Sequence, residues 1–139
     1  MNTSTPRLRR DVLAIYFAVG CGAGIGALLR YGAGLAATAL DQPGFWATLG
    51  VNIVGSFVIG WFATFTAPGG RRPLPQVQRQ FIMAGICGGL TTFSSLSLDT
   101  WVMLTGNGIS PAALYLVGSL ALSIGAAGLG YVIARRRSA

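Results

Sequence analysis

Histidine, glutamate and lysine are absent from this chain, so its ten cationic side chains are all arginine and its three acidic side chains are Asp11, Asp41 and Asp99. An enzyme site built on acid-base chemistry therefore has almost no groups to use. Charged residues make up only 9% of the sequence, whereas an ordinary soluble domain carries about 25%. The two cysteines, Cys21 and Cys87, lie inside apolar runs, which favours packing roles over a disulfide or a metal site. These shortages indicate that the protein is not an enzyme.

What the chain has instead is long hydrophobic runs. Hydrophobic residues form 53% of its 139 residues, and a bilayer core about 30 Å thick needs about 20 mostly apolar helical residues to cross it. Four stretches reach this length: residues 12–39, 45–66, 81–104 and 111–134. They leave no room for a soluble domain. The sequence therefore predicts an all-α membrane protein, with residues 1–139 forming one integral membrane domain of four transmembrane helices.

Arginine is distributed unevenly between the two ends of these spans. With four spans, the N-terminus, the loop between spans two and three, and the C-terminus share one side of the membrane. That side carries nine arginines: Arg7, Arg9, Arg10, Arg71, Arg72, Arg79, Arg135, Arg136 and Arg137. The loops on the other side carry none. The positive-inside rule predicts a multi-pass protein of the inner (plasma) membrane with both termini in the cytoplasm, and this explains the net charge of +7 without nucleic acid as a partner.

Small residues recur within the spans at spacings that let helices approach closely. Span one contains Gly20, Gly22, Gly24 and Gly26, and span four contains Gly118, Gly125, Gly128 and Gly130. Small-xxx-small spacing is typical of helix contacts in membranes. Because four helices alone bury little surface, we expect the chain to form oligomers.

The third span contains a polar stretch, GGLTTFSSLS at residues 88–97, at a depth where hydrocarbon is expected. Gly88, Gly89, Thr91 and Thr92 are poor helix formers, which indicates a helix broken at mid-membrane. Such a break survives only where it is buried in protein or lines a polar cavity. The alternative is a continuous helix whose hydroxyls bond back to carbonyls one turn earlier. Composition alone leaves both interpretations open.

Other uncharged polar groups at membrane depth favour the break. Asn52 lies in span two with Ser56 one turn on, and Tyr115, Ser119 and Ser123 follow one another at intervals of four in span four. A proton-coupled transporter would need a carboxylate deep in a span, and none is there. Amide and hydroxyl donors suit a small, strongly hydrogen-bonding anion, because they replace part of its hydration shell without trapping it.

Two further groups are compatible with ion passage. The edge of the Phe93 ring carries partial positive charge that suits an anion, although packing is the commoner role for a phenylalanine. Carbonyl oxygens exposed at a break are hard ligands that suit a small alkali cation.

The motifs GAGIGALLRY in span one, NIVGSF in span two and GGLTTFSS in span three, with the Tyr115, Ser119 and Ser123 stripe, resemble the CrcB or Fluc family of fluoride channels over nearly the whole chain. The resemblance implies passive, selective fluoride efflux that protects the cytoplasm. It also implies an antiparallel dimer with two pores, and a structural sodium ion at the dimer centre held by backbone carbonyls of the broken third helix.

The resemblance also implies roles for individual residues. Gly88 and Thr91 would supply the carbonyls that hold sodium. Asn52 would donate to fluoride, and Phe93 would be the first of the family's pair of phenylalanines. Residues expected along the polar route are Thr92, Ser94, Ser95, Tyr115, Ser119 and Ser123, and Arg30 matches an arginine near the aqueous vestibule that attracts anions.

Two departures from the family pattern bear on the partner. The second phenylalanine of the pair is replaced by Leu96, which has no ring edge. The strong arginine bias fixes one orientation, whereas an antiparallel homodimer needs subunits inserted both ways. We therefore hypothesise a heterodimer with a homologous subunit of opposite orientation, in which Leu96 impairs one pore; a homodimer is the alternative.

Rival functions are less consistent with the sequence. A small multidrug transporter needs a membrane-embedded glutamate, which this chain lacks. A partner subunit without transport of its own is the other rival, and Leu96 gives it some support.

Overall fold

The computed structural model describes residues 5–136, with side chains described from Arg10 onward. The side chains of Arg7 and Arg9, and Arg137 as a whole, lie outside the described residues. Regular structure in the described part is entirely helical: α1 (Thr5–Ala39), α2 (Gly44–Phe65), α3 (Gln76–Gln80), the π-helix η1 (Phe81–Cys87), α4 (Gly88–Leu90), α5 (Phe93–Gly106) and α6 (Ile109–Arg136).

The described chain contains four helical stretches that are long and apolar enough to cross a membrane. They are Arg10–Ala39, Gly44–Phe65, Gln76–Gly106 and Ile109–Arg136. The prediction of an all-helical protein with four long apolar helices is therefore confirmed. The third stretch is assembled from α3, η1, α4 and α5 in succession.

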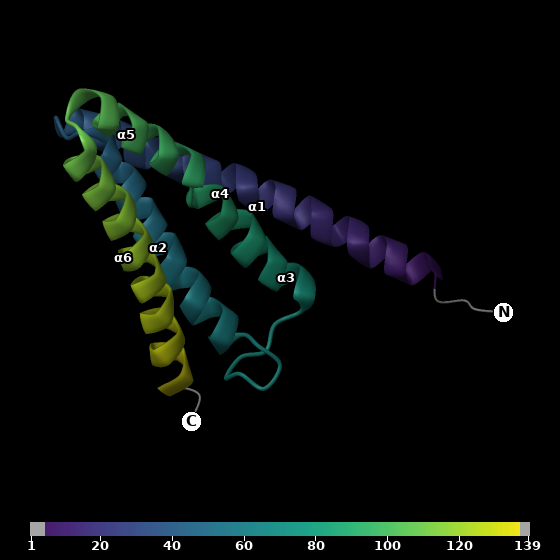
Figure 1. The fold of residues 1–139 in the computed structure, drawn as a ribbon. Coiled ribbons are helices and arrows are strands. Elements are labelled where there is room, and N and C mark those ends of the chain that lie inside the picture. Colours follow the sequence, from purple (N-terminus) through teal and green to yellow (C-terminus); the bar gives the residue numbers. More distant parts are fainter. Residues whose placement is uncertain (1–4, 137–139) are drawn as a thin grey trace.

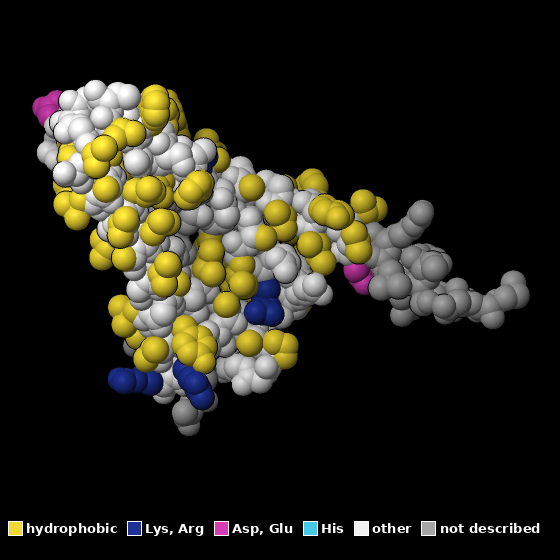
Figure 2. All heavy atoms as spheres, in the orientation of Figure 1, with side chains coloured by type: hydrophobic (Ala, Val, Ile, Leu, Met, Phe, Trp, Pro, Cys, Tyr) yellow, Lys and Arg dark blue, Asp and Glu magenta, His cyan; other side chains and the backbone are white. Residues whose placement is uncertain are grey.

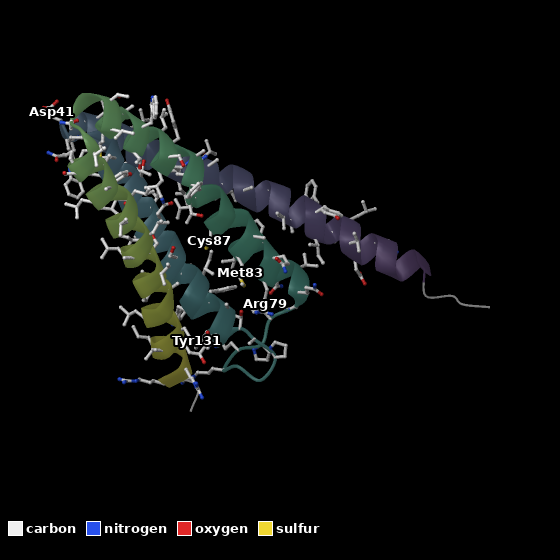
Figure 3. All side chains as sticks on the ribbon, in the orientation of Figure 1. Asp41, Arg79, Met83, Cys87 and Tyr131 are labelled. Atoms are coloured by element: carbon white, nitrogen blue, oxygen red, sulfur yellow. The ribbon has the colours of Figure 1, made fainter. Side chains whose placement is uncertain are left out.

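The helices form two pairs that converge at one end and spread apart toward the other (Figure 1). α1 packs along η1 and α4, and α2 packs along α6. α5 continues from α4 to the converging end, where it contacts α6. Arginine side chains are visible near the C-terminal end of α6 and at Arg79, whereas hydrophobic side chains are spread over most of the visible face (Figures 2 and 3). This distribution is what a bilayer around the helices requires.

Glycine lets α1 and the third helical stretch touch backbone to backbone. A Cβ atom on Gly22 would lie 2.9 Å from the Cα of Gly85, closer than Cβ atoms approach in proteins. A Cβ on Gly26 would overlap the backbone of η1 and α4. A Cβ on Gly20 or Gly24 would have no heavy atom within 4 Å in the described chain. Two of the four glycines predicted to form a contact stripe therefore make this internal contact, and the other two leave an open face.

Arg79 fastens the third helical stretch to the end of α2. Its Nε donates to Thr66 Oγ1 at 3.2 Å, and its Nη2 donates to Ala63 O at 3.2 Å. Arg79, Met83 and Cys87 lie one turn apart and point toward α2 (Figure 3). A guanidinium at a helix C-terminus satisfies carbonyls that have no partner within the helix and interacts favourably with the helix dipole.

Replacing Arg79 with alanine is expected to lower the free energy of unfolding by about 2 kcal/mol, because two hydrogen bonds from a charged donor are lost and Ala63 O is left without a partner. Thermal unfolding of the purified protein in detergent measures this. Arg72→Ala removes an exposed arginine from the adjacent loop and is the matched control. Equal melting temperatures for the two variants would contradict the fastening role.

Candidate functional site

Two residues with extended backbone separate α4 from α5. Thr91 has φ −74° and ψ 152°, and Thr92 has φ −150° and ψ 124°. Asn52 of α2 is only 8% exposed and holds Thr92 by both of its backbone groups. Asn52 Oδ1 accepts from Thr92 N–H at 2.7 Å, and Asn52 Nδ2 donates to Thr92 O at 3.0 Å. Asn52 thus supplies the hydrogen-bond partners that Thr92 would otherwise find within a helix.

The hydroxyl groups after the interruption form a cluster that caps α5. Thr92 Oγ1 accepts from Ser95 N–H at 3.1 Å. It also lies 3.1 Å from Ser94 Oγ and 3.2 Å from Ser95 Oγ. Ser97, in contrast, donates back to Phe93 O at 2.9 Å along the helix. The structure therefore brings Thr92, Ser94 and Ser95 together at the positive end of the α5 dipole.

A hollow of about 230 Å³ opens beside the interruption. We call it the break hollow, and its lining residues are Asn52, Ser56, Ile59, Thr91, Thr92, Phe93, Leu96, Leu120 and Ser123. Phe93 is 68% exposed, whereas Leu96 is 2% exposed. The hollow combines amide and hydroxyl groups with one aromatic ring. Sequence reasoning missed Ile59 and Leu120 as lining residues, because an apolar residue in an apolar helix carries no distinguishing signal.

Arg30 lines a separate hollow of about 300 Å³, which we call the arginine hollow. Its other lining residues are Ala27, Tyr31, Gly34, Gly44, Ala47, Thr48 and Ser95. Arg30 Nη1 donates to Thr91 O at 3.4 Å. The Thr92–Ser95 hydroxyl contact connects residues that line the two hollows. Thr48, a buried hydroxyl, was not among the predicted site residues.

Tyr115 and Ser119 line a third hollow, which is mostly apolar and measures about 400 Å³. The Tyr115 hydroxyl donates to Asp99 Oδ2 at 3.2 Å and lies 3.4 Å from Phe45 O. Ser119 is 3% exposed, and its Oγ has no hydrogen-bond partner within the described residues. Ser123 lines the break hollow instead. The three polar residues of α6 are therefore divided between two hollows.

Two backbone carbonyls at the interruption lose the amide partners that a continuous helix would give them. Thr92 N–H, which would bond to Gly88 O, donates to Asn52. Ser95 N–H, which would bond to Thr91 O, donates to Thr92 Oγ1. Neutral carbonyl oxygens are hard ligands that suit an alkali cation. Gly88 and Thr91 thus fit the expected sodium ion in donor chemistry, and no cluster of three or more metal-ligating side chains occurs among residues 10–136.

The chain is similar to known proteins over most of its length. The family described as "CrcB-like protein, Camphor Resistance (CrcB)" matches residues 17–131. The chain is 50% identical over 125 residues to "Fluoride-specific ion channel FluC 3" of Brucella abortus biovar 1 (strain 9-941), covering 89% of this chain and 91% of that protein. It is 45% identical over 130 residues to "Fluoride-specific ion channel FluC 1" of Rhodopseudomonas palustris (strain BisB18), covering 91% of each.

These relatives are named as ion channels, which agrees with the expectation that the chain is not an enzyme. The family match covers part or all of each of the four apolar stretches and both sides of the interruption. The chain therefore belongs to the CrcB family, the family of the fluoride-specific ion channels named FluC.

Proposed function

We propose that this chain is a subunit of a fluoride-selective channel that lets fluoride leave the cytoplasm passively and so lowers cytoplasmic fluoride. The observation that carries the proposal is the pairing of buried Asn52 with the extended residue Thr92 beside the break hollow. The names of the relatives support the same ion. In this proposal the interruption of the third span lies near the middle of the membrane, where protein surrounds its backbone groups.

The break hollow offers donors without ionisable groups. One hydrogen of Asn52 Nδ2 is used by Thr92 O, and an amide nitrogen carries two. The hydroxyls of Ser56 and Ser123 line the same hollow, and the N-terminus of α5 adds partial positive charge. Such groups replace the water around a small anion, and because none is a fixed cation the ion is able to leave again.

The remaining polar residues extend this route in both directions. Arg30 attracts anions to the arginine hollow, and the linked hydroxyls of Ser95 and Thr92 connect that hollow with the break hollow. Ser123, Ser119 and Tyr115 continue the polar groups along α6. The buried hydroxyl of Ser119, which has no hydrogen-bond partner in the part of the chain that the structure describes, is a donor that a passing ion or water would satisfy.

A second subunit completes the pores. We propose an antiparallel dimer with two pores, because the hollows are open in one chain and Phe93, at 68% exposed, is free to contact a partner. Carbonyls of Gly88 and Thr91 from both subunits would hold a structural sodium ion at the dimer centre. When bound, that ion would attract the carbonyl oxygens of both subunits and so hold the interrupted third span of one subunit against that of the other.

The partner we favour is a homologous subunit inserted in the opposite sense. In this proposal the chain spans the inner (plasma) membrane of the cell. Its arginines keep both of its termini in the cytoplasm. Leu96 is buried in the wall of the break hollow and offers no ring edge to an anion. The alternative function is therefore a non-conducting or partly conducting partner in a heterodimeric fluoride channel.

Fluoride efflux from liposomes tests these proposals. The chain is reconstituted alone and together with a homologous subunit, and external fluoride is recorded with an electrode after a potassium ionophore is added. Efflux only with both subunits supports the heterodimer, and efflux from the chain alone supports a homodimer. Absence of fluoride efflux in both preparations would contradict channel function.

Replacing Phe93 with isoleucine is expected to slow fluoride efflux about fivefold, because an aliphatic side chain fills similar space but lacks the positive ring edge, which is worth about 1 kcal/mol. Phe17→Ile is the matched control, since Phe17 is 76% exposed on α1 and distant in sequence from the interruption. Equal efflux rates for the two variants would assign Phe93 to packing alone.

A further inference from the structure

Two segments that carry arginine lie together at one end of the molecule. α2 and α6 run in the same direction, because Gly60 of α2 lies against Ala127 of α6 and the next residue of α2 lies against Gly130. The two helices therefore end side by side, with the α2–α3 loop next to the C-terminal end of α6 (Figure 1). We call the exposed arginines of these two segments the basic end: Arg71, Arg72, Arg135 and Arg136.

The carbonyl groups at the end of α2 do not need the side chains of the basic end. Ala63 O accepts from Arg79 Nη2 at 3.2 Å. Phe65 O accepts from the backbone N–H of Arg72 at 3.1 Å, so the loop folds against the helix by its backbone. The side chains of Arg72 and Arg136 are exposed, and neither has a hydrogen bond or ion pair with another residue that the structure describes. Helix capping therefore does not account for these charges.

No aspartate within residues 10–136 neutralises the basic end. Asp41 and Asp99 lie toward the converging end of the helices, in the α1–α2 turn and in α5 (Figures 1 and 3). Asp11 lies near the start of α1, which is remote from the C-terminal end of α6 (Figure 1). Arg135 has a neutral partner, since its Nη1 donates to Tyr131 Oη at 3.2 Å. The positive charge of the basic end is thus available to an anionic ligand.

A lipid headgroup fits the position of the basic end. Its arginines come after the ends of two apolar spans, where the phosphate groups of a bilayer lie. Tyr131 is 46% exposed at the same end (Figure 3), and tyrosine is enriched at headgroup depth. Leu129 and Val132, which precede the arginines of α6, are 55% and 42% exposed. This apolar surface suits an acyl chain, which a lipid carries and a free phosphate ion lacks.

We propose that the basic end binds the phosphate group of an anionic phospholipid. Guanidinium groups of the loop and of α6 donate charge-assisted hydrogen bonds to the phosphate oxygens, and an acyl chain lies along the exposed apolar surface of α6. Because the loop follows α2, the bound lipid links the ends of α2 and α6 and stabilises the folded protein. The basic end contributes no residue to the break hollow, the arginine hollow or the hollow beside Tyr115. Lipid binding is therefore independent of fluoride.

Thermal unfolding of the full-length protein in lipid-free detergent, with dioleoyl phosphatidylglycerol added stepwise, tests the proposal. We expect a saturable rise in melting temperature that neither dioleoyl phosphatidylcholine nor inorganic phosphate produces. Arg72→Gln and Arg136→Gln should each raise the half-saturating concentration about fivefold, and together about 25-fold, since each arginine near an anionic lipid contributes about 1 kcal/mol. The corresponding lysine variants keep the charge and should resemble wild type. Arg10→Gln removes the same charge from the remote end of α1 and is the matched control; it should also resemble wild type.

Tryptophan fluorescence measures where the lipid binds. Trp61 lies near the end of α2, whereas Trp46 lies at its start and Trp101 lies in α5. In a protein that carries Trp46→Phe and Trp101→Phe, brominated phosphatidylglycerol should quench Trp61 more than brominated phosphatidylcholine does at the same mole fraction. Adding Arg72→Gln and Arg136→Gln should remove this difference.

Each remaining outcome overturns the proposal. Equal effects of the two lipids would show that apolar contact alone is responsible, and an equal effect of inorganic phosphate would identify a free anion as the ligand. If Arg10→Gln weakens binding as much as Arg72→Gln, the attraction is diffuse and there is no site. If the lysine variants bind as weakly as the glutamine variants, charge is not the cause. If the glutamine variants fail to fold without lipid, these arginines serve the fold itself.

Discussion

Fluoride efflux is expected to fall at least about a hundredfold when Asn52 is replaced by aspartate. Asn52 makes two hydrogen bonds to the backbone of Thr92: it accepts from the N–H at 2.7 Å and donates to the carbonyl oxygen at 3.0 Å. A carboxylate keeps only the first bond, and its second oxygen then faces Thr92 O acceptor to acceptor. Leaving a buried carbonyl without its donor costs about 1–3 kcal/mol. The substitution therefore loosens the extended segment.

The added charge acts on the ion as well. Asn52 lines the break hollow, so aspartate places a negative charge on the proposed anion route. Two like charges 4 Å apart repel by about 4 kcal/mol at an effective dielectric constant of 20, which is close to a thousandfold in occupancy. Asn52→Ala separates the two effects, because it removes both bonds to Thr92 without adding charge, and its efflux should fall less than that of Asn52→Asp.

Asn107→Asp is the matched control, because it makes the same chemical change at an exposed residue that follows α5. Its efflux should equal that of wild type. Rates are normalised to folded protein, measured by size-exclusion chromatography, so that instability is not counted as lost conduction. Wild-type efflux from Asn52→Asp would remove Asn52 from the anion route and make its pairing with Thr92 purely structural.

The helices could be predicted from the sequence because hydrophobic length leaves few alternatives. An apolar run of about 20 residues satisfies its backbone groups in a membrane only as a helix or a closed barrel. Polar residues inside such runs are few, which made Asn52, Thr92 and Ser123 visible as candidates; all three line the break hollow. Rarity of a residue type at membrane depth is thus a usable signal for a site.

Pairing between distant residues could not be predicted from the sequence. Asn52 was assigned to the anion alone, whereas its two bonds to Thr92 span 40 residues. Weakness of the helix was assigned to two glycines, Gly88 and Gly89, and to two threonines, Thr91 and Thr92. Only the threonines are extended, and both glycines are helical in α4. Gly89 instead lets α1 approach, since a Cβ there would lie 2.8 Å from the Cα of Ala23. Composition identified the right segment but not the contacts that shape it.

The π-helix Phe81–Cys87 had no recognisable signal either. Ser119 was predicted to lie in a stripe with Tyr115 and Ser123, but it is 3% exposed because α6 packs along α2 on that side. Residues spaced four apart lie on nearly the same face of a helix, but each successive residue is rotated slightly around the helix axis. Which of these residues a neighbouring helix covers depends on the angle and position at which the two helices cross.

Gly130→Ala is expected to lower the free energy of unfolding by about 3 kcal/mol. α2 and α6 form one of the two helix pairs (Figure 1). Each helix contributes one glycine to their contact, Gly60 from α2 and Gly130 from α6. A Cβ on Gly130 would overlap Phe57 O and lie 2.8 Å from Trp61 N. A Cβ on Gly60 would likewise overlap the carbonyl group of Ala127. These obstacles are backbone atoms, so no side-chain rotation relieves them and the helices must separate.

Separating α2 from α6 should change the break hollow as well as lower stability, because Asn52 of α2 and Ser123 of α6 both line that hollow. The variant should therefore melt at a lower temperature and lose fluoride efflux together. Gly128→Ala, two residues earlier in α6, adds a Cβ with no heavy atom within 4 Å and is expected to match or slightly exceed wild-type stability, since alanine favours helix over glycine by about 1 kcal/mol. If both alanine variants melt alike, the crossing tolerates a methyl group and the close approach of the two helices is not what holds the pair together.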